Sequence, residues 1–455
     1  MKVKELYIKN YHQFEDFKLD LTYPEGYVDK DGNSKAGQPL DKICFIGQSG
    51  TGKTSLFEII QNFIKYAYVL AGAPDKSLGV TESDRLNDGT CVTLYSDHSN
   101  FNRLKISAEI EHNQIMLHSK PSFAEAKGIV KQGFKETLPI SIVYPVDFIN
   151  NLASLTYAYS GKEGLFLNFG GDSYSEIWYK INQKITEYRE HQIQKSLAIS
   201  EITGKIGFKS EDILEAARKY QEWEQNNPNP LQDLADRVLD RILNKFNLRV
   251  RTRLDFEKIE DVKTIKIENL EGQEVPYDFQ STGTKQIFLS MLPLYTLKPN
   301  RTAIFFDEPE RSLYPDIQKE IVDIYTSLTT DCQFFYATHS PIIASSFDPW
   351  EIVELKFNPK TGKVYQELYY EEERHVDNYK FHPKYLRWDD ILGRIFDLEE
   401  EGNPERMKAL KRLAILESKL KKNSISKEDK EVLWVEYSKL SKLTGWTTPM
   451  KYEKN

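Results

Sequence analysis

A glycine-rich segment near the start of this 455-residue chain constrains its fold more than any other feature. The segment Gly47-Gln48-Ser49-Gly50-Thr51-Gly52-Lys53-Thr54 fits the pattern G-x-x-x-x-G-K-[ST]. The run before it, Lys42 to Ile46, is mostly apolar, which is typical of a strand buried on both faces. Between Ser55 and Val69 the apolar residues recur at the spacing of a helix. Strand, loop and helix in this order predict a phosphate-binding loop within an α/β fold.

The chemistry of this loop suits a nucleoside triphosphate. Its glycines let backbone N–H groups curl around phosphate oxygens, and the helix that follows directs its positive end at them. Lys53 is expected to reach the β- and γ-phosphates, and the Thr54 hydroxyl is expected to bind Mg²⁺. The candidate residues for binding ATP are Gly47, Gln48, Ser49, Gly50, Thr51, Gly52, Lys53, Thr54 and Ser55.

A second motif, Ala303-Ile304-Phe305-Phe306-Asp307-Glu308-Pro309, is an apolar run that ends in two acids. It predicts a core strand whose carboxyl end lies beside the phosphate-binding loop. Asp307 is the second candidate metal ligand, directly or through water. Glu308 is the candidate catalytic residue that orients or deprotonates the attacking water.

Two further segments determine the class. Phe279-Gln280-Ser281-Thr282-Gly283-Thr284-Lys285-Gln286 precedes an apolar helix, and Phe335-Tyr336-Ala337-Thr338-His339-Ser340-Pro341 follows the acidic motif. With Ser312-Leu313-Tyr314-Pro315 as a D-loop, the ordered motifs resemble the ABC ATPases of the SMC/RecF/OLD branch. Gln280 stands where the signature of that family usually has leucine.

The resemblance implies an ABC ATPase head with a helical insertion and a C-terminal helical hairpin. It also implies that Ser281 and Gly283 contact the γ-phosphate of ATP held by a second copy, which gives an ATP-sandwiched homodimer and leaves higher oligomers open. His339 takes the place of the catalytic switch histidine. The Q-loop is unassigned, because Pro145-Val146-Asp147-Phe148 follows the strand expected at Ile140 to Tyr144.

The order of the motifs divides the chain into four expected regions. Residues 1–160 and 247–370 form the two parts of the head, residues 161–246 the helical insertion, and residues 371–455 a helical region for partner binding or oligomerisation. Alternation from Val3 to Asn10 predicts an edge strand. The helical pattern from Tyr174 to Phe246 breaks at Asn226 to Pro230.

Two charged surfaces leave their roles open. Arg249, Arg251 and Arg253 alternate with apolar residues on one expected strand, so they face nucleic acid or solvent. From Gly402 to Asn455 there are 13 Lys and Arg residues against 7 Asp and Glu residues, whereas the whole chain carries −8. This basic C-terminal surface either meets nucleic acid or an acidic partner, or is a solvated helix face.

The C-terminal region itself has two apolar stripes. One comprises Leu413, Leu416 and Leu420 and the other Leu433, Tyr437 and Leu440, which predicts a helical hairpin. Ser426 and Asp429 form a capping box at the start of its second helix. Two short helices bury both stripes poorly by themselves, so the hairpin either docks a partner, with Trp434 and Tyr437 as anchors, or caps the head.

Composition narrows the environment of the protein. No run of eighteen apolar residues exists and the amino terminus lacks the layout of a secretory signal, so we expect neither a membrane span nor secretion. Cys44, Cys91 and Cys332 are far apart in sequence, which suits reduced thiols in a cytoplasm and disfavours a zinc site.

Three functions remain for such an ATPase: control of a separate nuclease in phage defence, an OLD-type nuclease, and a RecF- or SMC-like DNA-binding repair protein. An OLD nuclease needs a Toprim domain, but the 116 residues after His339 contain no Asp-x-Asp. The Asp-Glu-Pro-Glu run at 307–310 and the segment Tyr385-Leu386-Arg387-Trp388-Asp389-Asp390 before the hairpin resemble the ATPase subunits of Septu-type, retron-associated defence systems. That resemblance implies an HNH nuclease partner, and the similar PARIS-type ATPases imply a Toprim nuclease instead.

Overall fold

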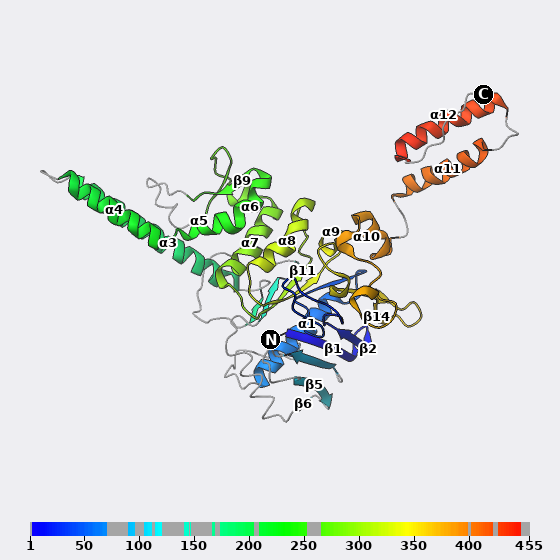
Figure 1. Ribbon diagram of the computed structural model, residues 1–455, viewed down its shortest axis with the longest axis horizontal. Helices are drawn as coiled ribbons and strands as arrows, with labels where there is room; N and C mark the ends of the chain where they lie inside the picture. Colours follow the sequence, from blue (N-terminus) through cyan, green and yellow to red (C-terminus); the bar gives the residue numbers. More distant parts are fainter. Residues whose placement is uncertain are drawn as a thin grey trace. The chain divides into compact units, whose positions relative to one another are not determined.

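The protein is described here by a computed structural model (Figure 1). It describes residues 2–70, 90–95, 104–111, 114–120, 141–144, 146, 166–168, 173–203, 209–252, 265–398, 402–421 and 426–446. The chain divides into two compact units, Met1–Tyr385 and Leu386–Asn455.

The first unit is built on a mixed sheet of twelve strands, in the order β6-β5-β4-β1-β2-β14-β13-β3-β12-β11-β7-β8. The strands β8, β7, β11, β12, β3 and β13 run parallel to one another, and the pairs in the rest of the sheet are antiparallel except for β14 with β2. The bounds are β1 Lys2–Tyr11, β2 Phe14–Asp20, β3 Lys42–Gly47, β4 Thr90–Tyr95, β5 Leu104–Glu111, β6 Gln114–Lys120, β7 Ser141–Tyr144, β8 Phe166–Asn168, β11 Ala303–Asp307, β12 Gln333–Ala337, β13 Ile352–Phe357 and β14 Val364–Glu367.

The parallel half of the sheet has a register that aligns three motifs. Asp307 of β11 lies opposite Ala337 of β12, and Ala337 lies opposite Phe45 of β3. The carboxyl ends of β3, β11 and β12 therefore share one edge of the sheet. The phosphate-binding loop, the acidic motif and the histidine segment each begin at this edge, as the sequence predicts.

The first strand is not the edge strand that the alternation predicts. β1 lies between β2 and β4, with Leu6 opposite Leu19 on one side and opposite Val92 on the other. Alternation reports that one face of a strand is buried, but it carries no information on whether backbone groups pair on one side or both. The expectation of an edge strand was therefore wrong for this physical reason.

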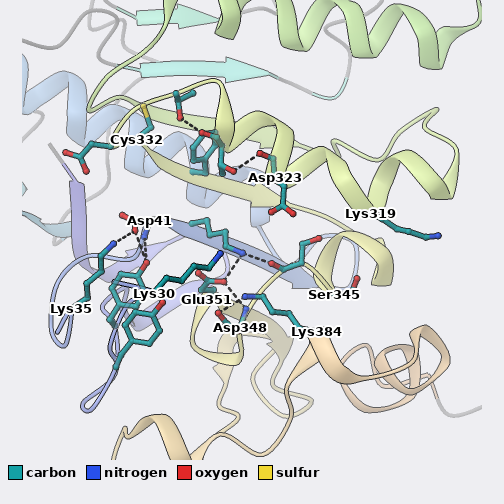
Figure 2. Close-up of a pocket in the computed structure, with 18 residues that line it drawn as sticks. Lys30, Lys35, Asp41, Lys319, Asp323, Cys332, Ser345, Asp348, Glu351 and Lys384 are labelled. Carbon is teal, nitrogen blue, oxygen red and sulfur yellow. Dashed lines mark hydrogen bonds and ion pairs between the residues drawn. The ribbon is translucent and has the colours of Figure 1, made fainter. Parts of the chain in front are cut away.

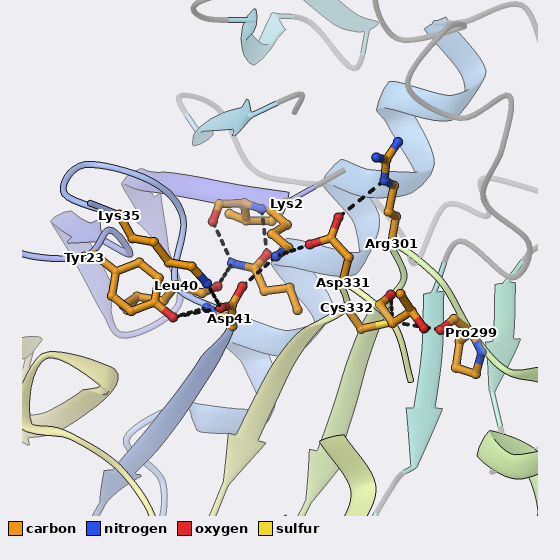
Figure 3. Close-up of polar contacts among 12 residues, drawn as sticks. Lys2, Tyr23, Lys35, Leu40, Asp41, Pro299, Arg301, Asp331 and Cys332 are labelled. Carbon is orange, nitrogen blue, oxygen red and sulfur yellow. Dashed lines mark hydrogen bonds and ion pairs between the residues drawn. The ribbon is translucent and has the colours of Figure 1, made fainter. Parts of the chain in front are cut away.

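Polar side chains fasten β1 to the centre of the sheet. The buried Gln333 side chain accepts a hydrogen bond from the Val3 N–H (2.7 Å) and donates to the carbonyl oxygens of Val3 and Leu40. Lys2 forms ion pairs of 2.6 Å with Asp41 and 2.8 Å with Asp331, as Figure 3 shows. The N-terminal strand is thus tied to the start of β3 and to the loop before β12.

An aromatic core joins the parallel strands to their helices. Phe57 of α1 (Lys53–Leu70) packs edge-on against Phe305, whose ring stacks on Phe335 at 4.7 Å. Phe306 stacks on Tyr325 of α8 (Pro315–Ser327) with ring centroids 4.2 Å apart. These rings are buried, and aromatic contacts of this kind stabilise the fold beyond their buried area.

Helices occupy the middle of the chain. α3 (Ser173–Thr203) and α4 (Ser210–Asn226) pack together through a stack of Tyr188 on Trp223. The predicted break is confirmed, because the Asn229 side chain caps α5 (Pro230–Leu234) by accepting from Leu231 N–H. The remaining elements are a π-helical turn at Ala235–Leu239, α6 (Asp240–Leu243), β9 (Leu248–Val250), β10 (Ile267–Asn269), α7 (Thr282–Leu297) and α9 (Pro341–Ala344).

Two of the three alternating arginines have partners within the chain. Arg249 and Arg251 form ion pairs with Glu268 of β10 at 2.7 and 2.9 Å. Arg253 lies outside the described residues. Both described arginines therefore link β9 to β10, and the Arg249 side chain is also 45% exposed, as the solvated-face interpretation expects.

The second unit contains α10 (Trp388–Arg394), α11 (Pro404–Leu420) and α12 (Lys427–Thr444). The predicted hairpin is present, and the Ser426 side chain caps α12 by accepting from Asp429 N–H at 3.2 Å. The two stripes bury each other: Leu413, Leu416, Leu420 and Tyr437 form a buried cluster, with Trp434 packed against it. Tyr437 is only 1% exposed, so its prediction as a free anchor was wrong.

Apolar side chains nevertheless remain on the outside of this hairpin. They are Ile415 on α11 and Val432, Val435 and Leu443 on α12, and we call them the outer hairpin residues. Among the residues that the structure describes, no helix is long and apolar enough to cross a bilayer.

Candidate functional site

The phosphate-binding loop has a backbone that only glycine permits at two positions. β3 ends at Gly47 and α1 begins at Lys53, so residues 48–52 form the turn between them. Gly47 has a φ of +144°, and a Cβ there would collide with the Leu355 carbonyl oxygen of the neighbouring β13. Gly52 has a φ of +88°, and a Cβ there would collide with the Gln13 side chain. A positive φ therefore explains both glycines, and at Gly47 the close approach of the β13 backbone leaves no room for a side chain.

Lys53 is held inside this loop. Its Nζ donates to the carbonyl oxygens of Gly47 (2.9 Å) and Gln48 (3.2 Å), and the residue is 7% exposed. Thr51, which is fully buried, also donates to Gln48 O at 2.8 Å. Burial lowers the pKa of Lys53, while the nearby carboxylates oppose that shift. The ammonium is a desolvated cation that lies in the loop where phosphate oxygens are expected.

Thr54 meets the acidic motif at the same edge. Its hydroxyl donates to Asp307 Oδ2 at 2.8 Å. Partial burial raises the pKa of Asp307, because desolvation disfavours the charged form of the carboxyl. A hydroxyl and a carboxylate fit Mg²⁺, which takes oxygen ligands and uses few from the protein beside substrate phosphates. The residues present therefore fit the metal that the sequence predicts.

Glu308 and His339 face each other beside this pair. Glu308 adopts a left-handed φ of +50°, and its N–H donates to Ala337 O at 2.8 Å. His339 Nε2 lies 4.0 Å from Glu308 Oε1. Burial lowers the pKa of His339, and the Lys53 ammonium lowers it further. The strained turn at Glu308 thus brings its carboxylate and the imidazole together at the sheet edge.

Two residues of this region were not predicted to belong to the site. Glu310 accepts a hydrogen bond from the His339 N–H at 2.8 Å. Gln286, within the apolar helix α7, donates from Nε2 to Pro309 O at 2.7 Å. The available signals were Gln286 as a polar residue in an apolar helix and Glu310 as the third acid of the run that begins at Asp307. Neither signal indicates which residue the side chain contacts.

Ser281 and Gly283 lie at the amino end of α7. Ser281 is the N-cap of α7, and its side chain accepts from Thr284 N–H at 3.1 Å. A Cβ on Gly283 would collide with the Ser312 carbonyl oxygen, so α7 packs closely on the segment expected to be the D-loop. Among the described residues, no hydrogen bond or ion pair links either residue to Gly47–Ser55.

A polar cavity of about 810 Å³ lies at the other end of the strands (Figure 2). It is lined by Lys42, the first residue of β3, and by Phe334 near the start of β12. Several of its charges neutralise each other, as in the pairs Lys42–Glu351 and Lys384–Asp348. The candidate site is therefore the edge with the phosphate-binding loop, and this cavity is separate from it.

Residues 1–344 match the family described as AAA ATPase domain. Among curated proteins, none matches the chain. Three solved structures of SMC heads are 12% identical to it, and each covers 81% of this chain. They are an Smc head bound to the C-terminal winged-helix domain of ScpA (98% of that chain, TM-score 0.43), a Pyrococcus furiosus Smc head with an extended coiled coil bound to the C-terminal domain of ScpA (96%, 0.40), and a Thermotoga maritima SMC head (99%, 0.40).

Proposed function

The chain belongs to the family of AAA ATPase domains, and from this premise we propose that it binds ATP with Mg²⁺ at Gly47–Ser55 and hydrolyses it to ADP and phosphate. The single observation that carries the proposal is the 2.8 Å hydrogen bond from Thr54 to Asp307. It joins the end of the phosphate-binding loop to a partly buried carboxylate on the neighbouring motif. Backbone N–H groups, an ammonium and a carboxylate then surround the same small volume.

Each residue of the site has a chemical role in this proposal. The Lys53 ammonium exchanges its hydrogen bonds to the loop carbonyls for hydrogen bonds to the β- and γ-phosphates. The phosphates supply the negative charge that the desolvated ammonium needs as a partner. Thr54 and Asp307 hold the Mg²⁺ ion, which supplies neutralisation of phosphate charge. Glu308 orients the attacking water and accepts its proton, and His339 lies beside it to contact the γ-phosphate.

A second copy of the chain completes the site in this proposal. Ser281 at the amino end of α7 offers backbone N–H groups and a hydroxyl, and among the described residues no hydrogen bond links it to the phosphate-binding loop of its own chain. Phe279 and Tyr314 lie within two residues of Ser281 and Ser312 and are 81% and 64% exposed. Large exposed aromatic side chains are favoured anchors of interfaces. These features support a symmetric dimer in which each chain gives Lys53 to one site and Ser281 to the other.

Release of phosphate from ATP tests the activity. The unmodified protein with Mg²⁺ should release phosphate, and Glu308→Gln should slow release by roughly 10²–10⁴ because the general base is lost while size is kept. Glu271→Gln, at an exposed position outside the site, is the matched control and should leave the rate unchanged. Equal rates in all three proteins would place the catalytic base elsewhere. No release by the unmodified protein would restrict the function to ATP binding.

The cellular role proposed here is control of a separate nuclease in phage defence. The support is the resemblance of 307–310 and of 385–390, with the hairpin, to Septu-type ATPase subunits, which implies an HNH nuclease. The outer hairpin residues offer a surface for such a partner. A PARIS-like scaffold for a Toprim nuclease and a RecF- or SMC-like DNA-binding ATPase are the alternatives.

Binding assays separate the three roles. Purified chain is mixed in turn with the HNH protein of a Septu-type system, a PARIS-type Toprim nuclease and double-stranded DNA, each with ATP. Complex formation with the HNH protein alone supports the first role. Binding only to the Toprim nuclease or only to DNA would replace it with the corresponding alternative.

A further inference from the structure

Glu310 is a carboxylate that the proposed chemistry leaves without a role, although it touches the histidine segment directly. Its Oε1 accepts a hydrogen bond from the His339 N–H at 2.8 Å. Its Oε2 is buried and lacks a hydrogen-bond partner among the residues that the structure describes. Burial raises the pKa of this carboxyl. Such a group is costly to keep, so a structural accident is a poor explanation.

The backbone around Glu310 connects it to Glu308. The Arg311 N–H donates to Glu308 O at 3.1 Å, and the Leu313 N–H donates to Glu310 O at 2.9 Å, so residues 308–313 form a tight turn. Gln286 of α7 holds this turn from the other side through Pro309 O. The Glu310 side chain therefore extends from a fixed turn to the segment 338–340.

The residues on either side of His339 are held by other contacts: the Thr338 N–H donates to Phe45 O at 3.1 Å, and the Ser340 hydroxyl donates to Gln318 Oε1 at 2.6 Å. His339 follows the last residues of β12, and its imidazole is partly exposed. The Ser340 N–H donates to the Thr338 hydroxyl oxygen at 2.9 Å. The hydrogen bond from the His339 N–H to Glu310 therefore helps to hold the backbone that places the imidazole 4.0 Å from Glu308.

We propose that Glu310 is a positioning residue, which fixes the His339 backbone so that the imidazole lies against Glu308. The proposal rests on the proposed hydrolysis of ATP and deepens it. The requirement is a hydrogen-bond acceptor at the correct distance, and the negative charge is not required. Glu310 thereby acts through His339 and does not touch the nucleotide itself.

Two conservative variants separate position from charge. Glu310→Gln removes the charge but keeps a carbonyl oxygen at the same reach for the His339 N–H. Glu310→Asp keeps the charge but withdraws the oxygens by one methylene. A positioning role predicts that Gln retains turnover to within about threefold while Asp loses about tenfold to a hundredfold in kcat, with KM for ATP unchanged. A role for the charge predicts the reverse order, which would overturn the proposal.

A second readout does not require turnover. The chain has eight histidines, and the ring cross-peak of His339 in a ¹H–¹³C spectrum is identified by its loss in His339→Gln. In the nucleotide-free protein, Glu310→Asp should shift this cross-peak and leave the other seven unmoved, and Glu310→Gln should leave it in place. An unmoved His339 cross-peak in Glu310→Asp, or an equal shift in Glu310→Gln, would also overturn the proposal.

The two readouts keep failures apart. If the unmodified protein releases no phosphate, the proposed hydrolysis fails, but the cross-peak still shows whether Glu310 positions His339. If phosphate is released and both variants match the unmodified protein, the hydrolysis stands and the positioning role is refuted. Unmoved cross-peaks of the other histidines show that each variant is folded.

Discussion

Thr54 donates a hydrogen bond of 2.8 Å to Asp307, although 253 positions separate the two residues along the chain. The contact arises because β3 and β11 flank β12 in parallel, so that their carboxyl ends meet at one edge. Residues that follow these strands therefore lie close together in space although they are far apart in the sequence. The site is therefore a consequence of strand order, in agreement with the rule that ligands bind beyond the carboxyl ends of parallel strands.

Loss of the Lys53 ammonium should weaken ATP binding. Lys53→Ala removes a buried cation whose two hydrogen bonds now go to Gly47 O and Gln48 O and would go to phosphate oxygens. Charged hydrogen bonds of this kind contribute about 1.5–3 kcal/mol each, so we expect affinity to fall at least tenfold to a hundredfold. An equilibrium titration with ATP measures it.

Lys30→Ala is the matched control for that titration. Lys30 is exposed and lines the cavity beside Lys42, at the amino end of β3, whereas Lys53 follows its carboxyl end. ATP affinity should be unchanged in this variant. Equal affinity of Lys53→Ala and the unmodified protein would remove the phosphate-binding loop from the proposal.

Much of the parallel half of the sheet could be predicted from the sequence. The apolar runs at 43–46 and 303–306 are buried on both faces, so their residue types alone indicate core strands. The glycine and lysine pattern indicated the loop between them because only glycine fits its backbone. The local sequence was therefore sufficient to predict these strands and this loop, because residue type alone determines their burial and backbone conformation.

Other features depend on partners that sequence does not identify. The interior place of β1 depends on pairing with β4, which begins at Thr90. Arg249 and Arg251 alternate as a solvated or DNA-binding face would, yet both contact Glu268. The sequence does not distinguish Glu310 from a glutamate exposed to solvent, and only the fold places the His339 N–H against it. Long-range contacts decide each of these cases.

An arginine at Ser281 should block the closed dimer. Ser281→Arg places a long cation where the proposed partner copy brings ATP, but it leaves the phosphate-binding loop of its own chain intact. Native mass spectrometry of Glu308→Gln with ATP should show dimers, and addition of Ser281→Arg should leave ATP-bound monomers.

The control for that variant is Ser281→Asn. Asparagine is as good an N-cap as serine, so α7 keeps its first turn without the bulk of arginine. Dimers should persist with asparagine at this position. If Glu308→Gln with ATP is monomeric at micromolar concentration, the dimer must be abandoned.

Removal of the Lys2 ammonium should destabilise the first unit. Lys2→Met keeps the length of the side chain but leaves Asp41 and Asp331 without the ammonium that now lies 2.6 and 2.8 Å from them (Figure 3). The Lys2 side chain is 9% exposed, whereas both acids are more than a third exposed, which weakens the effect. We expect the free energy of unfolding to fall by about 1–3 kcal/mol. Lys9→Met, at an exposed position of the same strand, should change it by less than about 0.5 kcal/mol.

The pH dependence of this pair follows from two shifts. Burial opposes the charge of Asp41, but Lys2 and Lys35 outweigh it and hold its pKa below 3.8, so its contribution is present above that value and lost as pH falls through the lowered pKa. Burial likewise opposes the charge of Lys2, but Asp41 and Asp331 raise its pKa above 10.5, so its contribution is lost as pH rises through the raised pKa. Denaturant titrations of the unmodified protein and Lys2→Met should therefore differ by a constant amount between about pH 5 and pH 9 and converge in acid. A difference that persists undiminished in strong acid would mean that Lys2 acts by packing alone.

Removal of the hairpin should abolish partner binding and spare the ATPase. The cut belongs after Tyr385, where the first unit ends, because a cut after Tyr369 would remove Arg374, which hydrogen-bonds the Thr22 hydroxyl and pairs with Asp20 at 2.7 Å. The shortened chain should keep its melting temperature for the first unit and its ATP affinity, but lose the nuclease.

The exposed face of α12 gives a sharper version of the same test within the full chain. Val432 and Val435 are each 69% exposed and three residues apart, so they share one side of α12, whereas Tyr437 lies in the buried cluster. A Val432→Glu, Val435→Glu double variant should lose the nuclease with little change in stability, since surface substitutions change the free energy of unfolding by less than about 0.5 kcal/mol. Lys430→Glu and Lys439→Glu, at exposed positions of the same helix, make a matched control for the added acidic charge. If the nuclease still binds the shortened chain, its docking surface lies on the first unit and the role of the hairpin is refuted. If the double lysine variant loses the nuclease while the double valine variant retains it, the basic surface of the hairpin and not its apolar side chains makes the contact.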